Sequence, residues 1–460
     1  MQQPSHTVLP VAIIGAGPVG LAAAAHAVRR GLTPVLFERG PSVGSSLRDW
    51  AHVRVFSPWR FNIDRAARAL LEEAGWTAPD DDALPTGGEI VRGYLEPLAA
   101  HPAIAPHLRL GAEVVAVTRA GLDKLTSPGR TDSPFVVAWR DAAGDEHRTL
   151  VRAVVDASGT WSTPNPMGAD GLPVPGERAA ADRIAYGIPD VLGAARDAHA
   201  GMVTMVVGSG HSAMNVVLDL LALKAQAPET RVLWALRRNR MARLLGGGLN
   251  DQLPARGALG LAATQAIADG RLELLAPYAA ERVERVGDGL RITGLLDGRR
   301  HETDVQRVVV ATGLRPDLSI LRELRVDLDP LMEAPPALAP LIDPNLHSCG
   351  TVPPHGVVEL SHPEPGFYIV GGKSYGRAPT FLMATGYEQA RSVVAEIAGD
   401  HAAARDVQLV LPETGVCSSD LAPAGAEEAA GGCCGTSAPA VAVAVAAVPT
   451  KTAGCCGTPA

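Results

Sequence analysis

Two glycine-rich segments carry residue types and a spacing that suit dinucleotide binding. The first holds Gly15, Gly17 and Gly20 after an apolar run, and a second apolar run ends at Glu38, with Arg39 beside it as a further candidate contact. The first glycine permits a tight turn, the second leaves room for a pyrophosphate and the third lets a helix lie close to the sheet. A carboxylate at Glu38 can accept hydrogen bonds from ribose hydroxyls. As the first of two such units, this segment predicts an FAD site, with a purely structural glycine turn as the alternative.

The second segment repeats the pattern, with Gly208, Gly210 and Ala213 in the three small-residue positions. Its second apolar run ends in Arg237 and Arg238 rather than in an acid. Guanidinium groups suit a phosphate dianion and have no reason to favour a bare ribose diol. The second segment therefore predicts NADPH, with a solvated surface cluster of arginines as the alternative.

The other residues of this second turn are Ser209, His211 and Ser212. His211 is expected to be a turn residue beside the phosphates rather than a catalyst. Ser212 is expected to cap the following helix and to touch the pyrophosphate. We include all three among the candidate cofactor contacts.

Two further glycine corners follow β-branched runs. Ser158 and Gly159 come after a run that ends at Asp156, and Thr312 and Gly313 come after a similar run. The carboxyl ends of parallel strands meet at the edge where ligands bind. Both corners are therefore candidate cofactor edges.

A third corner holds Gly371, Gly372 and Lys373 between a strand and a helix. It could place backbone amides at the pyrimidine edge of the flavin and a cation near the negative charge of reduced flavin. The alternative is an ordinary turn with solvated cations.

These motifs require strand-helix-strand units to position them. Apolar periodicity predicts a strand over 10–14, a helix over 21–30 and a second strand ending at residue 38. A second such unit starts near residue 202. The fold class is therefore α/β, with two Rossmann-like dinucleotide-binding domains in three layers.

The predicted domain order places the NADPH domain inside a discontinuous FAD domain. From residue 413 onward the chain is rich in Ala, Gly, Pro, Ser and Thr and has no aromatic residue, so it cannot bury enough apolar surface to fold alone. The predicted ranges are 1–198 and 307–400 for the FAD-binding domain, 199–306 for the NADPH-binding domain and 401–460 for a flexible tail.

Bulk composition narrows the function classes. The 460 residues are 47% hydrophobic and carry a formal net charge of −8, which favours a globular enzyme and gives no attraction to nucleic acid. The N-terminal segment lacks the basic region of a signal peptide, and no apolar run has the length of about 18 residues that a membrane helix needs. We expect a cytoplasmic protein with a small-molecule substrate and no nucleic-acid or membrane partner.

The cysteines are unevenly distributed. Cys349 is the first in the chain, and the tail repeats Gly-Cys-Cys-Gly-Thr. Without a cysteine pair in the body, electrons from a flavin would go to molecular oxygen, to a bound substrate or to the tail thiols. Thiolates on a pliable chain suit a soft ion such as arsenic(III), copper(I) or mercury(II), although an unselected low-complexity tail is the alternative. The candidate ligands are Cys417, Cys433, Cys434, Cys455 and Cys456.

Several of these features together resemble the flavin-containing monooxygenases. They are the two glycine segments, the glycine corners and the stretch from Arg48 and Trp50 through Ser57 and Trp59, which is similar to the flavin-proximal part of that family. The resemblance implies that Arg48 and Trp50 contact the cofactor. One departure is that the Phe-Gly-His fingerprint of the family has no match near Tyr186. With its double-cysteine tail, the chain resembles the members associated with arsenic resistance.

Three functions agree with this pattern. In the first, NADPH reduces FAD and oxygen then transfers one atom to a soft nucleophile such as a trivalent arsenical. In the second, a reductase passes electrons to the tail thiols or to a metal that they hold. In the third, the chain is a non-catalytic flavoprotein that binds metalloids.

Overall fold

The computed structural model describes residues 9–238, 253–346, 352–378 and 382–409. All of them belong to one compact unit, Met1–Asp420. The predicted soft-metal ligands lie outside the described residues; they are Cys417, Cys433, Cys434, Cys455 and Cys456.

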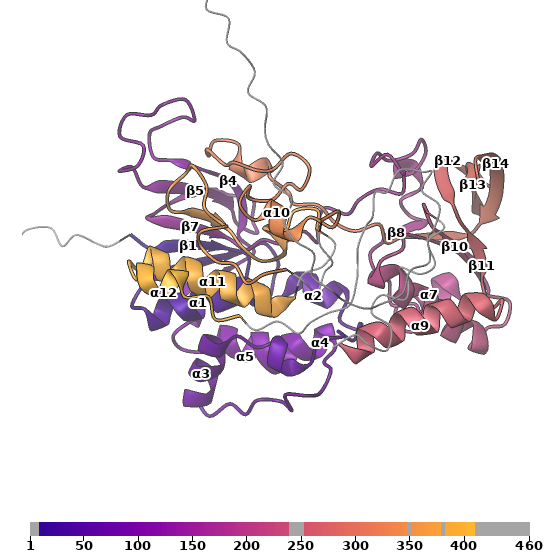
Figure 1. Cartoon of the computed structure of the whole chain (residues 1–460), viewed down its shortest axis with the longest axis horizontal. Coiled ribbons are helices and arrows are strands. Elements are labelled where there is room, and N and C mark those ends of the chain that lie inside the picture. Colours follow the sequence, from indigo (N-terminus) through magenta and orange to yellow (C-terminus); the bar gives the residue numbers. More distant parts are fainter. Residues whose placement is uncertain (1–8, 239–252, 347–351, 379–381, 410–460) are drawn as a thin grey trace, which may run out of the picture. The chain divides into compact units, whose positions relative to one another are not determined.

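A five-stranded parallel sheet carries the first glycine segment (Figure 1). Its strand order is β16-β7-β1-β2-β3. Helix α1 (Pro18–Arg29) joins β1 to β2, so the predicted strand-helix-strand unit is confirmed. The helix starts three residues earlier than expected because Gly17 is its N-cap and proline fits the first helical turn. The strands are β1 Val11–Ile14, β2 Pro34–Glu38, β3 Leu108–Leu110, β7 Ala153–Asp156 and β16 Phe367–Ile369.

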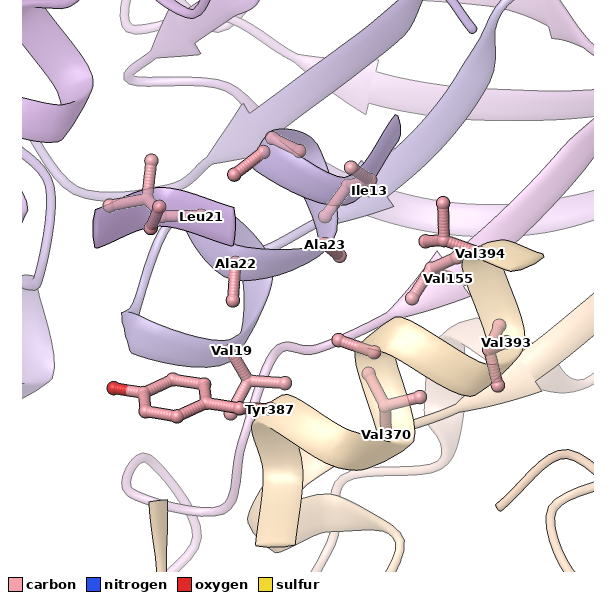
Figure 2. Packing of buried hydrophobic residues seen from close by; sticks show 14 of the residues in the cluster. Ile13, Val19, Leu21, Ala22, Ala23, Val155, Val370, Tyr387, Val393 and Val394 are labelled. Atoms are coloured by element: carbon pink, nitrogen blue, oxygen red, sulfur yellow. The ribbon is translucent and has the colours of Figure 1, made fainter. Parts of the chain in front are cut away.

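One face of this sheet is covered by α1 and α11 (Met383–Ile397). Figure 2 shows Ala22 and Ala23 of α1 and Val393 and Val394 of α11 in the shared apolar cluster, together with Val155 of β7. The alanines of α1 are fully buried, because small side chains let the two helices and the sheet approach closely. This packing fixes the start of α1 relative to the strand ends.

The other face is covered by an antiparallel sheet of β4 (Glu113–Arg119), β5 (Phe135–Arg140) and β6 (Glu146–Val151). Phe37 of β2 and Trp139 of β5 meet in this second apolar layer, with ring centroids 5.6 Å apart. In Figure 1, β4 and β5 lie on the side of β1 and β7 opposite to α1 and α11. Helix, parallel sheet and antiparallel sheet thus form the three predicted layers.

A second five-stranded parallel sheet carries the second glycine segment. Its order is β11-β10-β9-β15-β8. Helices α7 (His211–Gln226) and α9 (Pro254–Ala268) cover one face, and an antiparallel sheet covers the other. The parallel strands are β8 Ile184–Tyr186, β9 Val203–Val207, β10 Arg231–Ala235, β11 Glu273–Leu275 and β15 Arg307–Val310, and the antiparallel strands are β12 Tyr278–Val286, β13 Gly289–Leu296 and β14 Arg299–Val305.

Strand pairing differs from the predicted domain boundaries at two places. β8 and β15 lie outside the predicted range 199–306, yet both pair in the second sheet, with β15 hydrogen-bonded to β9 and β8. The corner of Thr312 and Gly313 therefore belongs to the second sheet and not to the first. A domain boundary that follows the pairing would lie before β8 and after β15.

The predicted tail also begins differently. Residues 401–405 form helix α12 (His401–Arg405), which packs on α11. Arg391 of α11 donates a hydrogen bond of 2.8 Å to Ala403 O. The range 401–409 is therefore part of the folded body, because α11 offers it a packing surface and a hydrogen-bond donor.

The remaining described elements are short connectors. No described helix has the length and apolar character that a membrane crossing requires. The helices are α2 Ser45–Asp49, α3 Arg65–Glu73, α4 Gly87–Ile90, α5 Glu96–Ala100, α6 Arg196–His199 and α10 Ala339–Ile342, and the tighter or wider turns are η1 Trp59–Phe61, η2 Val91–Leu95, η3 Ala105–His107, η4 Arg178–Ala180, η6 Ser319–Leu321 and η7 Gly371–Lys373.

Candidate dinucleotide-binding sites

The first glycine turn joins β1 to α1, and each of its glycines meets a different demand. Gly15 has φ +95°, and a Cβ there would lie 2.8 Å from Ala157 O. A Cβ on Gly20 would overlap Gly15 O. A Cβ on Gly17, in contrast, would meet no atom within 4 Å. Gly15 and Gly20 are therefore required by the fold, whereas Gly17 leaves open space at the helix N-terminus.

Glu38 ends β2 and is bound to the same turn. Its Oε2 accepts a hydrogen bond of 2.8 Å from the Ala16 amide, and its Oε1 accepts one of 2.8 Å from the Gly40 amide. These two amide donors fix the orientation of the carboxylate. Arg39, the next residue, is exposed.

Two further turns meet the first glycine turn. Ser158 and Gly159 follow β7, and Gly371, Gly372 and Lys373 form η7 after β16. Gly371 has φ +73° and lies against Val19 of α1, while a Cβ on Gly372 would meet nothing within 4 Å. These candidate residues, which lie far apart in the sequence, thus gather at the carboxyl edge of one sheet.

The structure excludes one of the two sequence-based interpretations of Lys373. Its side chain is only 1% exposed, so it is not a solvated cation. Its Nζ lies 2.7 Å from Asp156 Oδ2 and donates to Ser158 Oγ at 3.0 Å. The cation is therefore bound to a carboxylate at the end of β7. A buried lysine requires such a partner, because desolvating an unpaired charge is costly.

Charged groups also lie outside this buried pair. Hydrogen bonds from Ser319 are the main cause that lowers the pKa of Asp317, and the charges of Lys373 and Arg39 lower it further. Arg39, unlike the buried and paired Lys373, therefore carries an exposed positive charge on this side of the first sheet. A pyrophosphate dianion is favoured by such a charge.

The second glycine turn joins β9 to α7 and has the same design. Gly208 has φ +132°, and a Cβ there would overlap Ala311 O. A Cβ on Gly210 would meet nothing within 4 Å, and Ala213 is fully buried in the position of Gly20. Both Ser209 and Gly210 are exposed. The second turn thus also leaves open space at a helix N-terminus.

The N-cap residue of α7, at the end of this second turn, differs from the predicted one. The N-cap of α7 is Gly210, and no side chain caps the helix. Ser212 was predicted to be the cap, but it lies at the second helical position because the helix starts at His211. The His211 ring lies 5.3 Å from the Phe56 ring, which makes it a packing residue of the turn.

The ends of β10 and β15 flank the second turn. Arg237 is exposed and donates a hydrogen bond of 3.2 Å to Ala169 O, and Arg238 is half-buried. Thr312 Oγ1 donates to Asn165 O at 2.8 Å. Gly313 has φ +91° and accepts a hydrogen bond from the Asn165 amide. The arginines and this corner thus lie at the carboxyl edge of the second sheet.

Arg48 and Trp50 are held by other protein groups. Arg48 Nη2 lies 2.6 Å from Glu96 Oε1, and its Nε donates to Val43 O. Trp50 is half-buried and packs where a Cβ on Gly87 would lie. Within the same stretch, Ser57 and Trp59 are buried, so Trp59 is core.

Two adjoining cavities contain residues that were not predicted as site residues. One, of about 250 Å³, is lined by Asp49, Trp161, Tyr186 and their neighbours. The other, of about 560 Å³, is lined by Tyr186, Arg178, Arg315 and others. Trp161 Nε1 donates to Asp49 Oδ2 at 2.7 Å. The Ser-Gly-Thr-Trp stretch could have indicated Trp161, but no sequence signal pointed to Tyr186.

Tyr186 lies between the two cavities and has a fixed hydroxyl. It donates a hydrogen bond of 2.6 Å to Glu177 Oε1, and Glu177 is buried. Burial and this hydrogen bond raise the pKa of Tyr186. The phenol therefore stays protonated, and its oxygen can still accept a hydrogen bond from a ligand.

The geometry at both turns fits a dinucleotide. The N-termini of α1 and α7 have neither a side-chain cap nor an acidic residue in the first turn. Uncapped amides and the positive end of the helix dipole bind phosphate. Among the described residues, no group of three or more His, Cys, Asp or Glu side chains could hold a metal ion.

Comparison with known proteins supports the fold. Residues 13–76, which contain the first glycine turn and Glu38, match the model of the NAD(P)-binding Rossmann-like domain. A search of curated protein sequences finds no match. The one family match covers a small part of the chain, so the wider comparison rests on solved structures.

Three solved structures are similar over nearly the whole described chain. Bacillithiol disulfide reductase from Bacillus cereus has a TM-score of 0.63 at 17% identity and covers 86% of this chain and 100% of its own. The cadaverine monooxygenase from Erwinia amylovora, bound to FAD, has a TM-score of 0.60 at 13% identity, covering 92% and 100%. Ornithine N-hydroxylase from a Kutzneria species, with reduced FAD, NADP+ and L-ornithine, has a TM-score of 0.55 at 16% identity, covering 86% and 100%. At these identities the likeness shows the fold, a two-Rossmann-domain α/β architecture.

Proposed function

We propose that this chain is an FAD-dependent, NADPH-consuming oxidoreductase, and that it is a monooxygenase acting on a soft nucleophile such as a trivalent arsenical. The observation that carries the proposal is the pair of open glycine cradles at Gly17 and Gly210, each at the carboxyl edge of its own parallel sheet. Such edges are where dinucleotides bind. Two such cradles in one protein suit one tightly bound cofactor and a second that binds and dissociates in each catalytic cycle.

The two cradles differ in the charge beside them, and this supports the assignment. Glu38 presents a carboxylate at the first cradle, which suits ribose hydroxyls and opposes a 2′-phosphate. Arg237 is exposed at the second, where a guanidinium can pair with a 2′-phosphate. We therefore assign FAD to the first and NADPH to the second. The FAD-bound and NADP+-bound neighbours have the same two-domain fold.

Reduction of FAD by NADPH and reoxidation by oxygen would be supplied by the cofactors. The chain's own residues would bind and orient them. Glu38 would hold the adenosine ribose, and the first turn of α1 would hold the pyrophosphate. Gly159 and Gly372 leave open backbone at the same edge. The substrate would enter the cavities beside Trp161 and Tyr186, where the protonated Tyr186 can accept a hydrogen bond from it.

Oxygen dependence tests the monooxygenase. The purified FAD-loaded protein is supplied with NADPH and methylarsenite, with and without oxygen, and NADPH consumption and the oxidation state of arsenic are both followed. The proposal expects oxygen-dependent NADPH consumption and pentavalent product. Equal NADPH consumption in both atmospheres, with arsenic still trivalent, contradicts it.

A second candidate is a reductase that delivers electrons to the tail thiols or to a soft metal or arsenic(III) held by them. It is favoured by the fold shared with bacillithiol disulfide reductase. Replacing the four paired cysteines by serine separates the two candidates. The reductase predicts loss of turnover, whereas the monooxygenase predicts a raised KM for the metalloid with turnover retained. The four are Cys433, Cys434, Cys455 and Cys456.

A further inference from the structure

Lys373, Asp156 and Ser158 form a closed hydrogen-bonded network beneath the first glycine turn. Lys373 Nζ contacts Asp156 Oδ2 at 2.7 Å and Ser158 Oγ at 3.0 Å. Ser158 Oγ donates to Asp156 Oδ1 at 2.6 Å, and the Ser158 amide donates to the same atom at 3.1 Å. Asp156 and Lys373 are buried, whereas Ser158 is exposed. The network thus connects a buried ion pair to a residue on the ligand side.

The network lies in direct contact with the cradle. A Cβ on Gly15 would lie 3.0 Å from Ser158 Cα, so the turn after β7 packs tightly on the turn after β1. The Ala157 amide donates to Ile14 O, which joins the two strand ends. Any shift of Ser158 would therefore change the shape of the cradle. This tight contact makes the position of Ser158 relevant to a bound phosphate.

Donor groups remain available at this edge. A lysine ammonium has three N–H donors, and the described residues supply acceptors for two of them. The Gly159 amide, next to Ser158, has no acceptor within the described parts of the chain. Lys373 Nζ is buried, so the Gly159 amide, next to exposed Ser158, is the donor that suits an oxygen-rich anion outside the protein.

Stability alone is a weak reason for such a pair. A buried ion pair adds little compared with two well-packed apolar side chains, although removal of one partner is strongly destabilising. The chain has a second buried ion pair, in which Glu364 meets Arg119 and Arg130 before β16 begins. That pair lies at the amino ends of the strands. It provides a matched control that is away from the cradle.

We propose that the ion pair of Lys373 and Asp156 is a positioning unit that holds Ser158 and the Gly159 amide at the first cradle and thereby sets the affinity for FAD. The inference rests on the proposed FAD site. The unit acts through Ser158, so Asp156 needs no contact with the cofactor.

The test compares FAD affinity with stability in the full chain. The dissociation constant is measured by quenching of flavin fluorescence, and the melting temperature is measured on the same apoprotein. Variants K373M and D156N each leave a buried charge unpaired, so both should melt earlier and bind FAD more weakly. The double variant K373M/D156N removes both charges. It should recover most of the melting temperature yet bind FAD at least about tenfold more weakly, since Ser158 and the Gly159 amide are no longer held in place.

Two further variants keep the test decisive. S158A keeps the ion pair but removes the hydroxyl that donates to Asp156 and accepts from Lys373. It should weaken FAD binding about fivefold, with a smaller loss of melting temperature than K373M or D156N. E364Q, the control, should melt earlier and bind FAD as the wild type does. If K373M/D156N does not fold, the FAD affinity of S158A alone tests the positioning role.

The outcomes separate the inference from the proposed function. Wild-type affinity for FAD in the double variant or in S158A overturns the positioning role. An equal loss of affinity in E364Q also overturns it, because the effect would then follow stability. If the wild-type chain itself binds no FAD, the proposed FAD site fails, and the positioning role fails with it.

Discussion

Glu38 Oε2 accepts a hydrogen bond of 2.8 Å from the backbone amide of Ala16. The acid at the end of β2 is thereby tied to the turn that begins α1. Because its other oxygen accepts the Gly40 amide, the carboxylate is held in one orientation before any ligand binds. A preorganised acceptor lowers the entropy cost of binding a ribose diol.

Replacing Glu38 by Gln should therefore weaken FAD binding. The amide keeps the size but loses the charge and one acceptor, and a hydrogen bond to a charged group is worth about 1.5–3 kcal/mol, which corresponds to roughly 10- to 100-fold in affinity. Equilibrium titration of apoprotein with FAD measures it. E89Q is the control, since Glu89 also accepts a backbone amide, that of Thr86, but in an exposed capping box. Unchanged affinity in E38Q would remove Glu38 from the site.

The glycines of the first turn should separate folding from binding. G15A forces a φ of +95° on an L-residue against Ala157 O, which costs about 1–3 kcal/mol and should lower the melting temperature. G17A places its methyl in open space and should leave stability unchanged while reducing FAD affinity. Thermal melts of apoprotein and FAD titrations measure both. A stable G17A variant with wild-type affinity would contradict the cradle.

The same substitution in the second turn should act on the other cofactor. G210A should raise the KM for NADPH, because a methyl would occupy the open space at the start of α7. FAD affinity should not change. Steady-state kinetics with NADPH and FAD titration distinguish the two sites. A G210A variant that loses FAD and keeps its NADPH kinetics would reverse the assignment.

Arg237 should determine the preference for NADPH over NADH. R237Q removes a charge that can pair with the 2′-phosphate, so kcat/KM for NADPH should fall about tenfold or more, while that for NADH stays nearly constant. R231Q is the matched control, because Arg231 begins β10, at the end of the strand away from Arg237, and pairs with Glu273. Equal losses with both nucleotides would assign Arg237 a structural role.

Asp219 of α7 should make the fold more stable in mild acid. Burial, and to a lesser extent the charge of Asp190, raise its pKa to about 6, from 3.8 in the unfolded chain. The folded state thus binds the proton more tightly, so stability falls as the pH rises from about 4 to about 6 and stays lower above that range. D219N should raise the melting temperature at pH 7–8 and lose this advantage below about pH 4. Exposed Asp132 provides the control D132N, and a pH-independent gain in D219N would contradict the assignment.

Local patterns predicted the parts of the site that lie within one strand-helix-strand unit. The spacing from Gly15 to Glu38 reflects the geometry of a single turn and its two strands, so β1, α1 and β2 followed from the sequence. The same holds for Gly208 and α7. Helix starts were less accurate, since Ser212 was expected to be the cap and Gly210 is the cap.

Contacts between distant segments could not be predicted. Lys373 and Asp156 are 217 positions apart, and nothing in either local sequence indicates that their side chains form a buried ion pair. The predicted FAD-domain range 307–400 includes β15, yet hydrogen bonding puts this strand beside β9. Which sheet a strand joins depends on the crossover connections between strands, and hydrophobic periodicity does not encode those connections.

Anaerobic titration of the FAD-loaded protein with NADPH asks whether the nucleotide reduces the bound flavin. We expect loss of the oxidised-flavin absorbance at one NADPH per FAD, and recovery of the spectrum when oxygen is admitted. NADH should achieve the same only at higher concentration. A flavin spectrum that NADPH leaves unchanged would contradict an NADPH-consuming oxidoreductase and favour a flavoprotein that binds metalloids without catalysis.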